Sequence, residues 1–306
     1  MAGTDAGRPT VVVGVEDARG CRPAVWWACQ QAGRRGARVH LLHAAPAPVP
    51  VRALGQARYA GEQAERRAAA ARAVVDEVLE RARRDHPGVE VDGSVVHDDP
   101  RAALLEASRT AALVVTGARH AGRRRPDLGL HLGSTSLSVS ARACCPVAVV
   151  RDAEAEGVRG VVVGHDGSRG ADDALAVAAD HAQALGEPLL VVRAWRTALV
   201  PLDAWSGQVW VEAQDAEREG HREELAELAE RLRAERPGLE LRTDLVEGEA
   251  SDALLAAADG SRLLVVGTRG RGAFLTVLLG STSHDVLQRA PGPVVVVPDV
   301  RRNRGR

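Results

Sequence analysis

An internal repeat constrains the fold of this 306-residue chain more than any other feature. The segment TVVVGVED at 10–17 matches GVVVGHDG at 160–167, with an offset of 150 residues. Nearer the end of each copy, LGST at 132–135 matches LGST at 279–282, with an offset of 147 residues. The chain is therefore predicted to contain two copies of one domain, of which the first carries three extra residues.

The boundary between the copies falls in RDAEAEGV (151–158), a charged stretch of small residues that is typical of a linker. We predict one domain over 1–152 and a second over 157–306.

Within each copy, short apolar segments alternate with longer amphipathic ones. The apolar segments are rich in Val and Leu and lack polar alternation, as in parallel strands covered on both faces. In the second copy they are 160–164, 188–193, 240–246, 262–266 and 293–297. The clearest helical pattern covers 213–235, and its counterpart in the first copy covers 60–85. This order predicts an α/β fold with two tandem open parallel five-stranded sheets and helices on both faces. In such sheets, ligands bind beyond the carboxyl ends of the strands.

The composition excludes several classes of function. All 40 basic residues are arginine, so a P-loop lysine and a Schiff-base lysine are excluded. The net charge of -1 gives no reason to expect nucleic acid or an anionic membrane as a partner. We expect a cytoplasmic protein, because the chain shows neither a signal-peptide pattern nor an apolar segment long enough to span a bilayer.

Cysteine and histidine spacing predicts no metal site. Cys21, Cys29, Cys144 and Cys145 form no zinc-binding spacing and are interpreted as buried reduced thiols. The histidines form no metal-ligand set with acidic residues, and we interpret His40 and His43, on or near the second strand, as packing residues.

The segment after the fourth strand of copy two has the pattern G-x2-G-x9-G-S, starting at Gly267. Gly267 and Gly270 let the backbone approach a ligand, and Gly280 with Ser281 stands where the last helix should begin. Backbone N–H groups at such a helix start bind anions, and Arg269 adds positive charge. The pattern predicts a phosphate site built without lysine.

Asp166 follows the first strand of copy two and immediately precedes a predicted helix. Its carboxylate can accept a hydrogen bond from an adenosine amino group or a ribose hydroxyl. The alternative is that Asp166 only caps the helix. Beside the glycine pattern, we favour the ligand interpretation.

The glycine pattern, the V-G-x-D-G-S opening and the tandem repeat resemble the universal stress protein family in its two-domain form, over about residues 9 to 299. Members with this pattern bind ATP, so the resemblance implies an ATP site in the second domain. Mg or Mn could accompany the phosphates as a bridge. Gly164 and Asp166 would face the adenosine, Ala194 would line the adenine pocket, and Val246 would form a further wall. The residues implied around the phosphates are Gly267, Arg269, Gly270, Arg271, Gly272, Gly280, Ser281, Thr282 and Ser283.

Copy one departs from this pattern. Glu16 stands in place of Asp166, and His120 replaces the second glycine ahead of the arginine-rich tract 120–126. Either this loop has lost its function, which we favour, or its arginines contact phosphates in a reshaped site. The residues of this second, weaker candidate site are Gly14, Glu16, Ala44, Gly117, Gly133, Ser134 and Thr135.

The sequence favours an ATP-binding regulatory protein that acts in a stress response and is not an enzyme, since no general base or nucleophile motif is evident. An ATP-independent interaction module and a slow ATPase on the same fold stay open as alternatives. The resemblance also implies that the two copies pair as a pseudo-dimer through 147–150 and 293–297. A homodimer of the whole chain and a regulatory protein partner, not identifiable from sequence, are further expectations.

Overall fold

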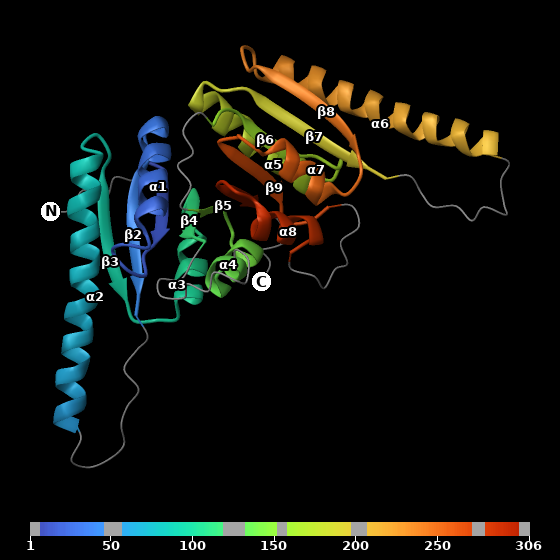
Figure 1. Ribbon diagram of the computed structural model, residues 1–306. Coiled ribbons are helices and arrows are strands. Elements are labelled where there is room, and N and C mark those ends of the chain that lie inside the picture. Colours follow the sequence, from blue (N-terminus) through green and yellow to red (C-terminus); the bar gives the residue numbers. More distant parts are fainter. Residues whose placement is uncertain are drawn as a thin grey trace. The chain divides into compact units, whose positions relative to one another are not determined.

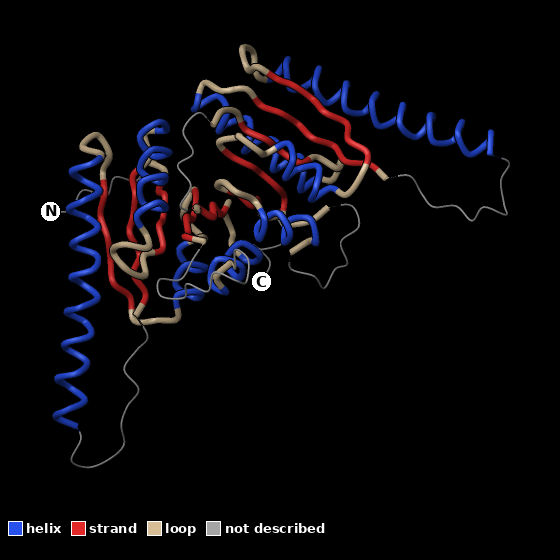
Figure 2. Tube along the Cα trace, viewed as in Figure 1, coloured by secondary structure: helices blue, strands red, loops and turns tan. Residues whose placement is uncertain are grey.

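The computed structural model describes residues 7–45, 57–118, 132–151, 158–196, 207–270 and 279–299. The chain forms two compact units, and the division falls between Ala153 and Glu154. Each unit has a sheet of parallel strands with helices packed against it (Figures 1 and 2). The predicted domain limits, 1–152 and 157–306, lie on either side of this division.

Unit 1 begins with β1 and ends its regular structure with β5. Its described strands are β1 (Thr10–Gly14), β2 (Arg38–Ala44), β3 (Val91–Val96), β4 (Leu113–Gly117) and β5 (Val147–Val150). Its described helices are α1 (Arg22–Arg35), α2 (Ala57–Asp85), α3 (Pro100–Ala107) and α4 (Ser134–Arg142). The strand order is β3-β2-β1-β4-β5, and each of these neighbours is parallel.

Unit 2 repeats this topology. Its described strands are β6 (Val161–Gly164), β7 (Leu189–Trp195), β8 (Leu241–Glu247), β9 (Leu263–Gly267) and β10 (Val294–Val297). Its described helices are α5 (Arg169–Leu185), α6 (Gly207–Glu235), α7 (Ala250–Ala257) and α8 (Ser281–Arg289). The strand order is β10-β9-β6-β7-β8, again with parallel neighbours. The predicted α/β fold class is confirmed, although α6 begins six residues earlier than its helical pattern predicts.

Helices cover both faces of each sheet because the apolar strands expose side chains to both sides. In unit 1, Gly93 faces α2, since a Cβ added there would lie 2.8 Å from a methyl carbon of Val75. Gly93 is in register with Leu41 of β2. The next residue of β2, Leu42, points to the opposite face of the sheet and packs with Leu104 of α3. Figure 1 shows the long helix of each unit against its sheet: α2 lies along β3, and α6 lies along β8.

The order of the strands in unit 2 creates a crevice at the carboxyl ends of the strands. From β6 the chain continues to its neighbour β7, whereas β9, which follows later in sequence, lies on the other side of β6. The loops after β6 and β9 therefore leave the sheet in diverging directions, and such a switch point is where open parallel sheets bind ligands.

None of the described helices is long and apolar enough to cross a membrane.

Candidate functional site

A cavity of about 480 Å³ lies at the carboxyl ends of β6 and β9, at this switch point. Its volume falls within the range of small-molecule binding sites. The described residues that line it are Gly164, His165, Asp166, Ala171, Val192, Ala194, Ala250, Leu254, Val266, Gly267, Arg269, Gly270, Gly280, Ser281, Thr282 and Ser283. Residues that the glycine pattern and the family resemblance select are thus brought together from positions more than 100 residues apart.

The loop after β6 holds the carboxylate of Asp166 at the cavity. Asp166 Oδ1 accepts a hydrogen bond from the backbone N–H of Ser168 at 3.0 Å. Gly167 permits this tight turn because its φ of 78° lies in the left-handed region. The cap of α5 is Ser168, whose Oγ accepts from the N–H of Ala171 at 3.3 Å. Asp166 is therefore not the helix cap, and this alternative interpretation of the sequence is wrong.

The loop after β9 passes directly against Asp166. A Cβ added to Gly270 would overlap the Oδ2 atom of Asp166, so a larger residue at 270 forces a shift of the loop or of the carboxylate. At Gly267 an added Cβ would lie 2.9 Å from the backbone oxygen of Gly170, which cannot move aside as a side chain does. The two glycines of the pattern are needed because two loops and a helix start crowd together here.

The start of α8 presents backbone N–H donors to the cavity. Gly280 is the N-cap residue and has no side-chain cap, so the first-turn N–H groups of Ser281, Thr282 and Ser283 have no partner within the helix. Two hydrogen bonds fix this helix start to the end of β9. Ser283 Oγ donates to the carbonyl of Gly267 at 2.6 Å, and the N–H of Gly280 donates to the carbonyl of Thr268 at 2.8 Å. An uncapped helix N-terminus of this kind attracts anions through its aligned N–H groups and its dipole.

The charged side chains of the cavity are few. Among its described lining residues, Arg269 carries the one permanent positive charge and Asp166 the one carboxylate. His165 is buried, and its Nε2 lies 3.1 Å from Oδ1 of Asp172 on α5. The cavity thus combines a helix N-terminus and a guanidinium, which suit phosphate, with a carboxylate that can accept hydrogen bonds.

The remaining wall of the cavity is apolar. Of its residues, the sequence predicts only Ala194. The wall comes from β7, β9 and α7 and consists of Val192, Ala194, Val266, Ala250 and Leu254. Leu254 packs against β6 so closely that a Cβ at Gly164 would lie 2.9 Å from its Cδ1. The contribution of α7 depends on tertiary packing, and no local sequence motif predicts it.

Among the described residues of the predicted set for unit 2, one is not brought to this cavity. Val246 lies in β8, in register with Ala194, and does not line the cavity. Ala194 of β7 supplies that wall instead, since β8 lies one strand further from β6. Arg271 and Gly272 lie outside the described residues.

Unit 1 keeps one part of this arrangement. Ser136 Oγ donates to the carbonyl of Gly117 at 2.8 Å, as Ser283 does to Gly267, and α4 begins at Gly133 without a side-chain cap. Ser134 and Thr135 therefore occupy the first turn of α4 as Ser281 and Thr282 do in α8.

The first loop of unit 1 differs. Asp17, not Glu16, forms the turn, and its Oδ1 accepts from the N–H groups of Arg19 at 2.9 Å and Gly20 at 2.7 Å. Glu16 is exposed, while Gly14 and Ala44 end β1 and β2. The tract 120–126 lies outside the described residues, so weak or absent ligand binding in unit 1 stays a prediction.

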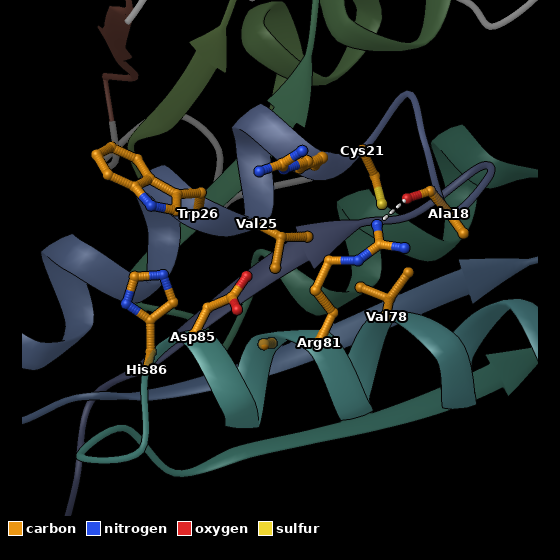
Figure 3. Close-up of a pocket in the computed structure, with 10 residues that line it drawn as sticks. Ala18, Cys21, Val25, Trp26, Val78, Arg81, Asp85 and His86 are labelled. Atoms are coloured by element: carbon orange, nitrogen blue, oxygen red, sulfur yellow. Dashed lines mark hydrogen bonds between the residues drawn. The ribbon is translucent and has the colours of Figure 1, made fainter.

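A second cavity, of about 20 Å³, lies between α1 and α2 and has room for about one water molecule. Figure 3 shows Arg81 reaching across it to donate to the carbonyl of Ala18 at 2.9 Å, beside the thiol of Cys21. Burial raises the pKa of the Cys21 thiol to about 12, so it is protonated at neutral pH. This cavity is a packing defect rather than a ligand site.

The cysteines are free thiols, as the sequence predicts. Cys21, Cys29 and Cys145 are buried, whereas Cys144 is only half-buried, so the prediction of burial is wrong for that one residue.

The described residues hold no cluster of three or more metal-ligating side chains.

Comparison with known proteins agrees with this architecture. A universal stress protein of Mycobacterium tuberculosis is 28% identical over 94% of this chain and 95% of its own length. A universal stress protein of Mycolicibacterium smegmatis is 32% identical over 94% of this chain and 96% of its own length. The crystal structure of a universal stress protein from Archaeoglobus fulgidus has a similar fold, with a TM-score of 0.65, 21% identity, and coverage of 94% of this chain and 96% of that one.

The family model gives the same result for each copy separately. The model of the universal stress protein family matches residues 7–151 and again residues 157–298, one match for each copy of the repeat. The chain therefore belongs to the universal stress protein family and has its tandem two-domain form.

Proposed function

We propose that the protein binds ATP in unit 2 and uses the bound nucleotide to regulate a stress response. The observation that carries the proposal is that an uncapped helix N-terminus, a guanidinium and a carboxylate all line one cavity of about 480 Å³. Phosphate is the anion that such helix starts commonly bind.

Each part of the nucleotide has a matching part of the cavity. The triphosphate would accept hydrogen bonds from the first-turn N–H groups of α8 and from the guanidinium of Arg269. The adenosine would lie against Val192, Ala194 and Leu254, and donate a hydrogen bond from its amino group or a ribose hydroxyl to Asp166. A Mg or Mn ion would arrive with the phosphates, because Asp166 is the one carboxylate among the described lining residues.

We propose binding rather than turnover as the primary activity. The proposal assigns the single carboxylate of the described lining, Asp166, to the adenosine, so no second carboxylate among the described lining residues is left to activate water at the phosphates. Slow ATP hydrolysis is an alternative that the same site allows, and an ATP-independent interaction module is the alternative if no nucleotide binds. A regulatory protein partner, pairing of the two copies, a homodimer and a cytoplasmic location stay predictions of this proposal.

The repeat offers a matched pair of variants for the test. Gly280→Asp places a carboxylate at the start of α8, where it would repel a phosphate, and Gly133→Asp makes the same change at the start of α4 in unit 1. We expect Gly280→Asp to weaken Mg-ATP binding by at least about tenfold, or 1.4 kcal/mol, and Gly133→Asp to leave it within about twofold. Isothermal titration measures both affinities, and native mass spectrometry of the wild type counts the nucleotides that each chain retains.

We expect one ATP for each chain in native spectra, with its affinity lost in Gly280→Asp. Two nucleotides, or equal effects of the two variants, would contradict the assignment of binding mainly to unit 2. If the wild type retains no nucleotide and gains none from Mg-ATP, the proposed function is wrong.

A further inference from the structure

A serine, a histidine and an aspartate form a continuous hydrogen-bonded array on the sheet of unit 1. Nε2 of His40 lies 2.8 Å from Oγ of Ser94, and Nδ1 of His40 lies 2.5 Å from Oδ1 of Asp92. Each ring nitrogen of the histidine therefore has one partner, a hydroxyl on one side and a carboxylate on the other.

The strand register builds this array. In the parallel pair of β2 and β3, His40 lies in register with Asp92, and Ser94 is two residues further along β3. Residues two apart on a strand point to the same face, so all three side chains share one side of the sheet. This side is opposite to the one that α2 covers, since Gly93, between Asp92 and Ser94, faces Val75 of α2.

The contacts suit the transfer of a proton from Ser94 to His40. In the neutral form of the imidazole, an ionised Asp92 offers only acceptor oxygens, so the ring proton lies on Nδ1. Nε2 is then an acceptor and receives the hydrogen bond from the hydroxyl of Ser94. In serine nucleophiles of this kind, a carboxylate orients a neutral imidazole. The imidazole accepts the hydrogen bond of the serine hydroxyl and thereby activates it.

The array is partly exposed to solvent. The side chain of His40 is 29% exposed and that of Asp92 is 49% exposed, while Ser94 is half-buried. On the same face, Leu42 lies in register with Ser94, and Val96 packs partly buried in the adjoining apolar cluster. Leu42 is buried, so the partly exposed side chain of Val96 is the apolar surface that an uncharged acyl group meets on this face.

The backbone of β3 supplies a hydrogen-bond donor beside the hydroxyl. The N–H groups of Val39 and Ala45 donate to the carbonyls of Glu90 and Val96, so the even-numbered residues of β3 turn their backbone groups toward β2. The N–H of Val95, directly after Ser94, consequently points to the other edge of β3, where no described strand lies. One such donor next to the nucleophile can stabilise the oxyanion that forms on attack.

The fold itself does not require these three side chains. At the equivalent positions of unit 2, with the offset of 150 residues, stand Leu190, Arg242 and Asp244, and the same strand pair forms there with the same register. The array is thus a feature that unit 1 has in addition to the common architecture.

We propose that Ser94 is an acyl-accepting nucleophile and that unit 1 hydrolyses short uncharged carboxylic esters. Oγ of Ser94 attacks the carbonyl carbon of the ester while its proton passes to Nε2 of His40. The bond to the alkoxy group then breaks, and His40 returns the proton to the departing alcohol. Water, deprotonated by His40, cleaves the acyl-serine to release the carboxylic acid and restore Ser94, so that ester and water yield acid and alcohol.

The expected rate is low, because Asp92 is half exposed and Val95 is a single oxyanion donor. Loss of one such donor costs about 10² to 10³ in rate in serine hydrolases that have a full set. A reagent that traps the nucleophile is therefore a sharper probe than turnover alone.

The test uses the full chain and a biotin-linked fluorophosphonate, which forms a phosphorus–oxygen bond to an activated serine and releases fluoride. We expect the native wild type to be labelled at Ser94, as located by peptide mass spectrometry, and the urea-unfolded protein to be unlabelled there. Ser94→Ala should abolish the label and also the p-nitrophenyl acetate hydrolysis above background. His40→Gln should slow labelling by at least about tenfold. Ser261→Ala, a change at a half-buried serine in a loop of unit 2, is the matched control and should label as the wild type does.

Circular dichroism establishes that each variant is folded, and Asp92→Asn serves as a second probe of the array if His40→Gln unfolds. Absence of label at Ser94 in the native wild type would overturn the proposal. So would labelling that is equally fast in unfolded protein, or labelling that folded His40→Gln and Asp92→Asn leave unchanged.

Discussion

At the scale of single residues, the candidate ATP site depends on a contact between a glycine and a carboxylate. Gly270 is not in a left-handed conformation, so its lack of a side chain is needed for space and not for backbone freedom. Asp166 occupies that space, and its position is fixed by the N–H of Ser168. The sequence predicts both residues as parts of the site, and the structure adds the reason that one needs the other.

Replacing Gly270 with alanine tests this contact. The added Cβ would push the loop after β9 or the Asp166 carboxylate out of place, so we expect Gly270→Ala to weaken ATP binding by about tenfold, or 1.4 kcal/mol. Gly220→Ala is the control, because Gly220 lies in α6 with open space around its Cβ position. Titration calorimetry of both variants gives the comparison. Unchanged affinity in Gly270→Ala would show that the loop does not need to lie close to Asp166 when the nucleotide binds.

At the scale of secondary-structure elements, the helix starts fall into two kinds. Ser168 caps α5 and Asp99 caps α3 through side-chain oxygens that accept from first-turn N–H groups. By contrast, the N-cap residues of α4 and α8 are Gly133 and Gly280, which supply no side-chain cap. The capped helices satisfy their own donors, whereas the uncapped ones leave donors for a ligand or solvent.

The cap of α3 should give a measurable pH dependence of stability. The hydrogen bond from the Arg101 side chain, together with that from its backbone N–H, lowers the pKa of Asp99 from 3.8 to about 2. Because the folded-state pKa is the lower one, the stabilisation is fully present above pH 3.8 and is lost as the pH falls toward 2. An asparagine at this position keeps the cap without the charge, so the difference in free energy of unfolding between wild type and Asp99→Asn should shrink over this range. Urea unfolding at several pH values measures it, and a difference that stays constant down to pH 2 would contradict the prediction.

At the scale of the whole molecule, the sequence predicts the fold well because the repeat and the Val-rich segments carry most of it. The strands of unit 2 lie within two residues of their predicted ends, since parallel strands covered on both faces have an unambiguous apolar pattern. The part of the cavity formed by the glycine pattern is likewise predictable, because its glycines and hydroxyls all come from one segment of the sequence, 267–283.

What could not be predicted depends on contacts between distant segments. Leu254 reaches the cavity from α7, and Val246 misses it because β8 lies one strand too far away. His40 is interpreted from sequence as a packing residue, yet it bonds to Asp92 and Ser94, which are 52 and 54 positions away. That contact follows from the register of β2 and β3, which no local pattern specifies.

The proposed binding of nucleotide in unit 2 alone predicts an asymmetric response of the two units to nucleotide. Hydrogen exchange of the whole chain with and without Mg-ATP should show slower exchange in 164–171 and 279–284, the segments at the cavity. The equivalent segments of unit 1, 14–21 and 132–137, should exchange at unchanged rates, because Glu16 is exposed and the turn there is made by Asp17. Equal protection of both sets of segments would contradict this asymmetry and indicate a second nucleotide site.

The bonds from Ser136 to Gly117 and from Ser283 to Gly267 have a consequence for protein engineering. Each one ties the end of a strand to the start of the next helix, so the segment between them begins and ends at anchored points. The two copies already carry segments of different length and sequence between the same anchors. We therefore expect that replacing the sequence between these two anchor points, with Gly270 kept in unit 2, changes the choice of ligand while the strand end and the helix start stay in place.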